Sequence, residues 1–216
     1  MYIAQRRLLV GGKTEPSPVL DGLIAWIDGR DTITNQGVPD RASDDFCAVS
    51  SDGVSLANAI GAYYIIQSGI QYKRSVTVGS PSGTALTGVK TVEVSLKLLS
   101  TLNMTQGETV FASFFTSRWD GWRSTEFGWI DGIRAEAIHM LSTTDGTTCK
   151  TYYNGVLKRT DTLAQLPNVS SMMAYTKPQG PVGQLAYLGT IRVYNKTLSA
   201  EEIYNNYYYE IGLERY

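Results

Sequence analysis

The stretch from Gly189 to Glu202, GTIRVYNKTLSAEE, decides the fold that this sequence predicts. Side chains along its first part alternate between the two sides of an extended strand: Leu188, Thr190, Arg192 and Tyr194 on one side, Ile191 and Val193 on the other. Ser199 is followed three residues later by Glu202, which is the spacing of a capping box at the start of a helix. The stretch therefore predicts a last strand that runs into a short helix and closes the domain.

Upstream of this stretch, the sequence alternates between short apolar runs and turn-forming residues. Strands are expected at 21–28, 46–50, 62–67, 72–78 and 89–99. Asp131-Gly132 and Asn154-Gly155 favour two-residue type I′ turns between strands, and a third turn is expected at Asp145-Gly146. About a dozen short strands with almost no helix before residue 199 predict an all-β, antiparallel two-sheet jelly-roll sandwich. A short C-terminal helix and an extended N-terminal arm complete the predicted fold.

The composition is typical of a single folded domain. It does not favour nucleic acid or a membrane as a partner. Of the 216 residues, 43% are hydrophobic and 18% are charged, which is enough apolar material for a core. The net charge of −1 gives no large field to attract nucleic acid or an anionic membrane. No apolar run is long enough to span a bilayer.

The two cysteines and the single histidine give no metal-binding pattern. Cys47 and Cys149 are far apart in the sequence, and their spacing is unlike that of metal ligands. Two separate buried thiols are favoured over the alternative of one disulfide. His139 lies in the apolar run IRAEAIHML and is predicted to be a strand side chain. A transition-metal site is therefore not expected.

Residues 1–20 are predicted to form an N-terminal arm, and residues 21–216 form the domain. Two glycines and two prolines in GGKTEPSP give the end of the arm a linker-like composition. We expect several arm side chains to contact a partner: Tyr2, Arg6, Arg7, Leu8 and Leu9. The alternative is that the arm packs along its own domain. The apolar run 8–10 is too short for a secretory signal, so synthesis in the cytoplasm is expected.

Three segments resemble one known family. CKTYYNGVLKRTDT is similar to the late Asn-Gly hairpin of laminin-G-like, concanavalin A-like domains, and DGLIAWIDGRD is similar to their opening strand. LGTIRVYNKTLSAEEIYNNYY resembles their last strand and terminal turn. The resemblance covers roughly residues 20–210. It implies that the first and last strands pair, with Leu23–Asp28 beside Gly189–Tyr194.

The family's fold also includes glycoside hydrolases, and the sequence does not support that activity. These enzymes resemble one another in a Glu-x-Asp-x-Glu strand whose two carboxylates flank the scissile bond. This chain has no such motif, and Glu93 and Glu136 are each expected to be a solvent-facing residue on a strand. We therefore expect no catalytic residues and no enzymatic activity.

One aromatic segment is a candidate for sugar binding. SRWDGWRSTEFGW contains flat rings that can stack on sugars and charged groups that can bind hydroxyls. The candidate ligand-binding residues are Trp119, Asp120, Trp122 and Arg123. The alternative is that these aromatic rings belong to the core or to a subunit contact. Trp26 and Trp129 are predicted to be core residues.

Calcium is common in laminin-G-like domains, so the resemblance raises the question of a calcium site. Asp28, Asp120 and Asp145 are possible ligands. No dense acidic loop such as Asp-x-Asp accompanies them, and turn-forming aspartates explain them better. We therefore expect no cofactor.

The C-terminal run YNNYYYEIGLERY puts tyrosine rings on several sides of one short helix. One side can pack on the domain, while the others stay exposed or meet another chain. The predicted interface residues are Tyr204, Tyr208 and Tyr209. A helix that lies flat on its own sheet is the alternative.

These features lead to a hypothesis about function. Laminin-G-like domains usually work outside cells, whereas this chain shows no export signal, carries a basic arm and has no catalytic set. A non-enzymatic bacteriophage virion protein, in a capsid decoration or a fibre, reconciles these observations. Its expected partners are other virion proteins, copies of itself and cell-surface glycans. The alternatives are a carbohydrate-binding module of a secreted, extracellular protein and, less favoured, a glycoside hydrolase.

Overall fold

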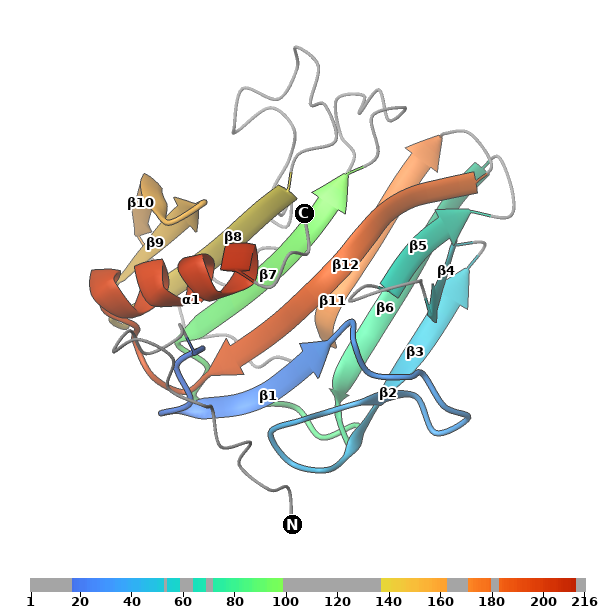
Figure 1. The fold of residues 1–216 in the computed structure, drawn as a ribbon, viewed down its shortest axis with the longest axis horizontal. Coiled ribbons are helices and arrows are strands. Elements are labelled where there is room, and N and C mark those ends of the chain that lie inside the picture. The colour runs from blue at the N-terminus through green and yellow to red at the C-terminus, as the bar shows by residue number, and fades with distance from the viewer. Residues whose placement is uncertain are drawn as a thin grey trace.

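The computed structural model describes residues 17–52, 54–58, 64–68, 72–98, 137–162, 171–179 and 183–212. Within these ranges the chain forms twelve strands and one helix (Figure 1). The elements are β1 (Leu23–Asp28), β2 (Val38–Pro39), β3 (Phe46–Asp52), β4 (Val54–Asn58), β5 (Tyr64–Ser68), β6 (Tyr72–Pro81), β7 (Thr91–Leu98), β8 (Ala137–Thr144), β9 (Thr148–Tyr153), β10 (Val156–Thr162), β11 (Ser171–Gln179), β12 (Gly183–Tyr194) and α1 (Ala200–Gly212).

The described strands form two antiparallel sheets. The larger, eight-stranded sheet has the order β10-β9-β8-β7-β12-β5-β4, and β1 also pairs with β12. The smaller sheet has the order β11-β6-β3-β2. Figure 1 shows α1 lying across one face of the larger sheet, over β8 and its neighbours. The fold is therefore the all-β two-sheet sandwich with a C-terminal helix that the sequence predicts.

β12 organises the larger sheet because other strands pair with it along both of its edges. β7 pairs along one edge of β12. Two strands share the other edge: β5 pairs with Gly183–Leu188, and β1 pairs with the residues from Thr190 to Tyr194. The register of β1 on β12 runs from Leu23 opposite Tyr194 to Asp28 opposite Thr190. This confirms the predicted pairing of the first and last strands.

The tight turn between β9 and β10 also matches its prediction. Asn154 and Gly155 have φ values of 49° and 74°, both in the left-handed region that a type I′ turn requires. Gly155 is also constrained by its neighbours, because a Cβ added there would lie 3.1 Å from Cδ1 of Tyr207. The hairpin tip therefore lies against α1. The turn expected at Asp131-Gly132 lies outside the described residues.

Both faces of the larger sheet are buried near its centre. One face is apolar and includes Val94, Ile191 and Val193, each at most 1% exposed. The opposite face carries polar residues such as Thr190 and Arg192, and α1 lies on this face, where its Glu210 is paired with Arg192. Because alternate residues of a strand point to opposite faces, β7 and β12 each supply both kinds of surface.

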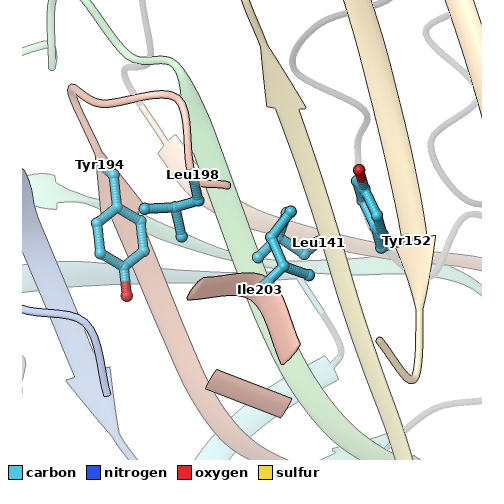
Figure 2. Packing of buried hydrophobic residues seen from close by; sticks show 5 residues of the cluster. All are labelled: Leu141, Tyr152, Tyr194, Leu198 and Ile203. Atoms are coloured by element: carbon cyan, nitrogen blue, oxygen red, sulfur yellow. The ribbon is translucent and has the colours of Figure 1, made fainter. Parts of the chain in front are cut away.

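α1 begins at the capping box that the sequence predicts. The backbone N–H of Ser199 donates to Oε2 of Glu202 at 2.9 Å, and the backbone N–H of Glu202 donates to Oγ of Ser199 at 3.2 Å. Leu198 and Ile203 are buried against the sheet in one apolar cluster (Figure 2). The sheet side of this cluster consists of Leu141, Tyr152 and Tyr194. Burial of each aliphatic side chain contributes about 1.5–3 kcal/mol to the docking of the helix.

Cys47 and Cys149 are buried free thiols, as the sequence favours. Burial raises the pKa of Cys47 to about 12 and that of Cys149 to about 11, which keeps both thiols protonated and unreactive at neutral pH. Within the described ranges, no helix is long and apolar enough to cross a membrane.

Candidate functional site

The strands that flank the candidate sugar-binding segment are described, whereas its key residues are not. These four residues lie outside the described part of the chain: Trp119, Asp120, Trp122 and Arg123. Lys97 of β7 pairs with Ala137 of β8. β7 therefore ends and β8 begins at the same end of the larger sheet.

The chain immediately before β1 is bound to α1. The backbone N–H of Val19 donates to Oδ1 of Asn206 at 2.8 Å, and the hydroxyl of Tyr194 donates to the carbonyl of Val19 at 3.2 Å. The predicted contact residues of the arm lie outside the described residues: Tyr2, Arg6, Arg7, Leu8 and Leu9. The domain therefore holds the arm's last residues beside its C-terminal helix.

Beneath α1 lies a group of buried charges, which we call the ionic layer and define as Glu93, His139, Arg192 and Glu210. The three charged side chains are 0% exposed and His139 is 1% exposed. The guanidinium of Arg192 forms ion pairs with both Glu93 and Glu210. Nε2 of His139 lies 3.0 Å from Oε1 of Glu93. Arg192 therefore joins the centre of the sheet to the helix.

Strand register brings these residues together. Arg192 of β12 is directly opposite Glu93 of β7, and Ser95 of β7 is opposite His139 of β8. Residues opposite each other on antiparallel strands share a face. The carboxylate of Glu93, the guanidinium of Arg192 and the imidazole of His139 therefore all lie on the face that α1 covers. Glu210 completes the layer from the helix.

Further hydrogen bonds satisfy both carboxylates. Nδ2 of Asn206 donates to Oε2 of Glu93 at 2.6 Å and to the hydroxyl of Tyr194 at 3.0 Å. Oγ of Ser95 donates to Oε2 of Glu210 at 2.9 Å. Buried charges are tolerated when they are paired and fully hydrogen-bonded, and these two carboxylates meet that condition.

The ion pairs control the protonation of the layer. Burial acts to raise the pKa of Glu93, but Arg192 and His139 outweigh it, and the pKa lies below its ordinary value. Burial acts to lower the pKa of Arg192, yet Glu93 and Glu210 raise it above its ordinary value. Glu93 is therefore ionised and Arg192 charged at neutral pH.

The prediction that Glu93 faces solvent is wrong. Its side chain is fully buried because α1 covers the face of β7 that simple alternation assigns to solvent. A signal for this existed in the sequence, since Arg192 lies between Ile191 and Val193 in the central strand. A charged residue at such a position is buried only when it has a partner of opposite charge. Glu136 lies outside the described residues.

A second group of paired charges lies beside the ionic layer. Asp28 is paired with Arg30 at 2.5 Å and with Arg41 at 3.1 Å, and Arg41 is also paired with Asp31 at 2.7 Å. The ring of Trp26 lies between two guanidinium groups, with the Cζ atoms of Arg41 and Arg192 each 5.1 Å from a ring centroid. Trp26, predicted to be a core residue, is only partly buried and packs against these two cations.

Tyr209 belongs to this buried region. Its side chain is 5% exposed, its ring lies 5.2 Å from Cζ of Arg192, and its hydroxyl accepts a hydrogen bond from Arg30 at 3.3 Å. Of the three tyrosines predicted at an interface, Tyr209 is therefore occupied by contacts within its own domain.

The other two tyrosines are exposed and stacked. Tyr204 is 57% exposed and Tyr208 is 49% exposed, and their ring planes lie 17° apart with centroids separated by 6.3 Å. Val156 and Leu157, beside the hairpin tip that touches Tyr204, are 56% and 47% exposed. We call these four residues the tyrosine surface. That Tyr204 and Tyr208 meet another chain stays a prediction.

The aspartates considered for calcium have other roles where they are described. Oδ1 of Asp145 accepts hydrogen bonds from the backbone N–H groups of Thr147 and Thr148 at 2.8 Å each, which builds the turn between β8 and β9. These bonds lower the pKa of Asp145. Asp28 is held by its two arginines. No group of three or more metal-ligating side chains occurs among the described residues.

The two buried glutamates of the ionic layer are not placed as a catalytic pair. General acid–base catalysis needs a carboxyl group that reaches a substrate. Glu93 and Glu210 are enclosed beneath α1 and bound to Arg192. The ionic layer therefore acts as a structural contact between helix and sheet.

Comparison with known proteins gives a fold and no family. No family model matches the chain, and no curated protein matches it. Among solved structures, the receptor-binding domain of botulinum neurotoxin D is similar, with a TM-score of 0.59 and 16% identity over 89% of this chain and 54% of that chain. The binding domain of botulinum neurotoxin DC in complex with SialylT gives a TM-score of 0.56 and 13% identity over 91% of this chain and 52% of that chain.

A third similar structure is of botulinum neurotoxin type C, described by its interaction with two ganglioside molecules. Its TM-score is 0.57 at 12% identity, over 90% of this chain and 52% of that chain. This chain therefore spans about half the length of the solved chains it resembles. What they share with it is the β-sandwich fold, and at these identities the likeness concerns the fold alone.

Proposed function

We propose that this chain is a non-catalytic recognition domain that binds glycans. The observation that carries the proposal is the lectin-like sandwich shared with receptor-binding domains, two of which are described with gangliosides or SialylT. The binding residues in this proposal are those of the candidate segment: Trp119, Asp120, Trp122 and Arg123. Aromatic rings that stack on the sugar and charged groups that bind its hydroxyls are suited to this ligand.

Two features of the domain support this proposal. The only fully buried glutamates among the described residues are bound to Arg192, which favours recognition over hydrolysis. The candidate segment lies in the sequence between β7 and β8, which are adjacent strands of the larger sheet. Segments that connect neighbouring strands are common positions for binding residues.

We further propose that the domain belongs to the laminin-G-like group and works on a bacteriophage virion. In this proposal the basic arm anchors the domain to other virion proteins or to copies of itself, and the sandwich faces outward. The hydrogen bond between Val19 and Asn206 supports an arm that leaves the domain beside α1. The alternative is a carbohydrate-binding module of a secreted protein, which acts outside the cell.

A glycan array tests the recognition function. The full chain is applied to sialylated and neutral oligosaccharides, including ganglioside headgroups, together with the variants Trp119→Ala and Trp122→Ala. We expect binding to at least one oligosaccharide, and about tenfold weaker binding for each variant, which corresponds to about 1.4 kcal/mol.

The matched control is Tyr204→Ala, which removes an exposed ring from α1. We expect this variant to bind as the wild type does. No binding by the full chain contradicts the glycan function. Binding that depends on Tyr204 and not on the two tryptophans contradicts the assigned site.

A truncation tests the role of the arm. Residues 1–16 are removed, so that Val19 keeps its bond to Asn206. We expect a folded monomer that no longer joins a larger assembly, as measured by sedimentation velocity and by incorporation into particles. Unchanged incorporation contradicts the anchoring proposal and leaves the glycan function untouched.

A further inference from the structure

Most of the exposed large apolar side chains in the described part of the chain gather on α1 and the start of β10. Six such side chains are exposed among the described residues: Leu20, Val156, Leu157, Tyr204, Tyr208 and Ile211. Four of them form the tyrosine surface, and Ile211 extends it, because Tyr204, Tyr208 and Ile211 are spaced by four and three residues along α1. Apolar side chains that gather in this way on an exposed surface mark a site of interaction.

The first turns of α1 run beside the hairpin that β9 and β10 form. The backbone N–H of Leu198, just before α1, donates to Oγ1 of Thr143 at 3.3 Å, and Thr143 is opposite Lys150 of β9. At the tip of the hairpin, a Cβ added to Gly155 would lie 3.5 Å from Cδ2 of Tyr204. The helix and the hairpin therefore form two adjacent sides of one exposed surface (Figure 1).

Exposed charges of opposite sign lie on these two sides. Glu201, in the first turn of α1, is an exposed acid, whereas Lys150 of β9 and Lys158 of β10 are exposed bases. No described residue forms an ion pair with any of these three side chains. The other two charged residues of β10, Arg159 and Asp161, are paired with each other. The surface therefore has an acidic side on the helix, a basic side on the hairpin, and exposed apolar side chains on both.

We propose that the tyrosine surface binds the same surface of a second copy of this chain. In a two-fold pair whose axis runs between α1 and the hairpin, each helix faces the hairpin of the other copy. Glu201 then meets the two lysines of the other copy's hairpin, and this contact occurs twice in the pair. The rings of Tyr204 and Tyr208 pack on the exposed apolar residues at the start of the other copy's β10. The charge pattern of the surface complements itself, which is why a second copy is the partner that fits it.

The contact surface is small, so the pairing is weak. Stable interfaces contain about 20–30 residues on each side, and this surface offers fewer. We expect a dissociation constant on the order of 10–100 µM, so that the free chain is monomeric at about 1 µM. Copies that are held close together have an effective concentration in the millimolar range, at which a contact of this strength is occupied. The pairing requires neither a glycan nor the N-terminal arm.

Charge reversal tests the pairing and its geometry. Sedimentation equilibrium of the full chain is measured from about 1 µM to about 500 µM, and we expect a reversible equilibrium between monomer and dimer. The helix variant Glu201→Lys and the hairpin variant Lys150→Glu with Lys158→Glu each place like charges opposite one another. We expect each variant alone to pair at least about tenfold more weakly than the wild type.

An equal mixture of the two variants is the decisive sample. Each helix of one variant then faces a hairpin of opposite charge on the other variant, so we expect the mixed dimer to form as strongly as the wild-type dimer. The control, Asp45→Lys, makes the same change of charge at an exposed position before β3, in the smaller sheet, and should leave the pairing unchanged. All of these positions are exposed, and circular dichroism checks that each variant is folded.

Several results would overturn the proposal. A wild-type chain that stays monomeric at the highest concentration excludes the second copy as the partner. Equal pairing of the wild type and the helix variant, or a mixture that pairs no better than either variant alone, excludes the proposed geometry. A dimer that disappears when residues 1–16 are removed assigns the pairing to the arm instead. None of these results bears on the glycan function.

Discussion

The two faces of the larger sheet are both buried, but different forces stabilise them. On one face, Val94, Ile191 and Val193 pack as aliphatic side chains, which need only complementary volume. On the other face, Arg192 requires Glu93 and Glu210 at defined positions on two different elements. The apolar face tolerates neighbours of similar size, whereas the charged face accepts α1 in one register. The difference suggests that stability depends on both faces and that the specific position of the helix depends on the charged one.

The largest effect should come from breaking the charged face. Arg192→Met leaves Glu93 and Glu210 buried without their cation, and we expect a loss of about 3–5 kcal/mol in the free energy of unfolding. Urea denaturation monitored by circular dichroism measures this loss. A loss below about 1 kcal/mol would mean that other groups compensate the two carboxylates.

A cavity on the apolar face should cost somewhat less. Ile191→Ala removes three carbon atoms from a fully buried side chain, and we expect a loss of about 2–4 kcal/mol. Ile191→Val is the matched control and should lose about 1 kcal/mol. In the same urea experiment, α1 should stay docked in both variants. Selective loss of helix signal in Ile191→Ala would show that the two faces are not independent.

Acid should weaken the charged face and leave the apolar face intact. The pKa of Glu93 is lower in the folded chain than in the unfolded chain, so its contribution is present above the unfolded value and is lost as the pH falls through the folded value. We expect the wild type to lose stability below about pH 4.5. Glu93→Gln should be less stable at neutral pH and less sensitive to acid. Parallel pH profiles for the two proteins would refute this assignment.

The smallest effect should come from the start of the helix. Ser199→Ala removes the side-chain half of the capping box, and we expect a loss of about 1 kcal/mol. Ser199→Asp is the control, since aspartate also accepts the N–H of Glu202 and should restore most of the stability. Thermal unfolding is sensitive enough for both. An unchanged melting temperature in Ser199→Ala would mean that Leu198 and Ile203 alone hold this end of α1.

Local chemistry made much of the fold predictable. Ser199 and Glu202 are three residues apart, and Asn154 and Gly155 are adjacent, so their geometry follows from short-range rules. The pairing of β1 with β12 came from a resemblance, and the structure confirms it. Such features need no knowledge of what packs above the sheet.

The ionic layer could not be predicted in the same way, because its contacts join distant parts of the chain. Glu93 and Arg192 are 99 positions apart in the sequence. The alternation of apolar and polar residues in β7 predicted that Glu93 faces solvent, because this pattern carries no information about the helix that covers that face of the strand. One sign was present: Ile203, Asn206 and Glu210 are spaced by three and four residues and share a helix face. An acid on the apolar face of a helix indicates a buried base in the sheet. The sugar-binding residues stay a prediction.

The central position of β12 has a consequence for the order of events during synthesis. β12 is the last of the described strands to be synthesised, yet β1, β5 and β7 all pair with it. A nascent chain that ends before Gly183 has three strands with unpaired edges at the middle of its main sheet. Folding of the larger sheet therefore waits for Gly183–Tyr194, and contacts between such distant segments favour slow folding. A premature stop before Gly183 would remove the centre of the sheet rather than its margin.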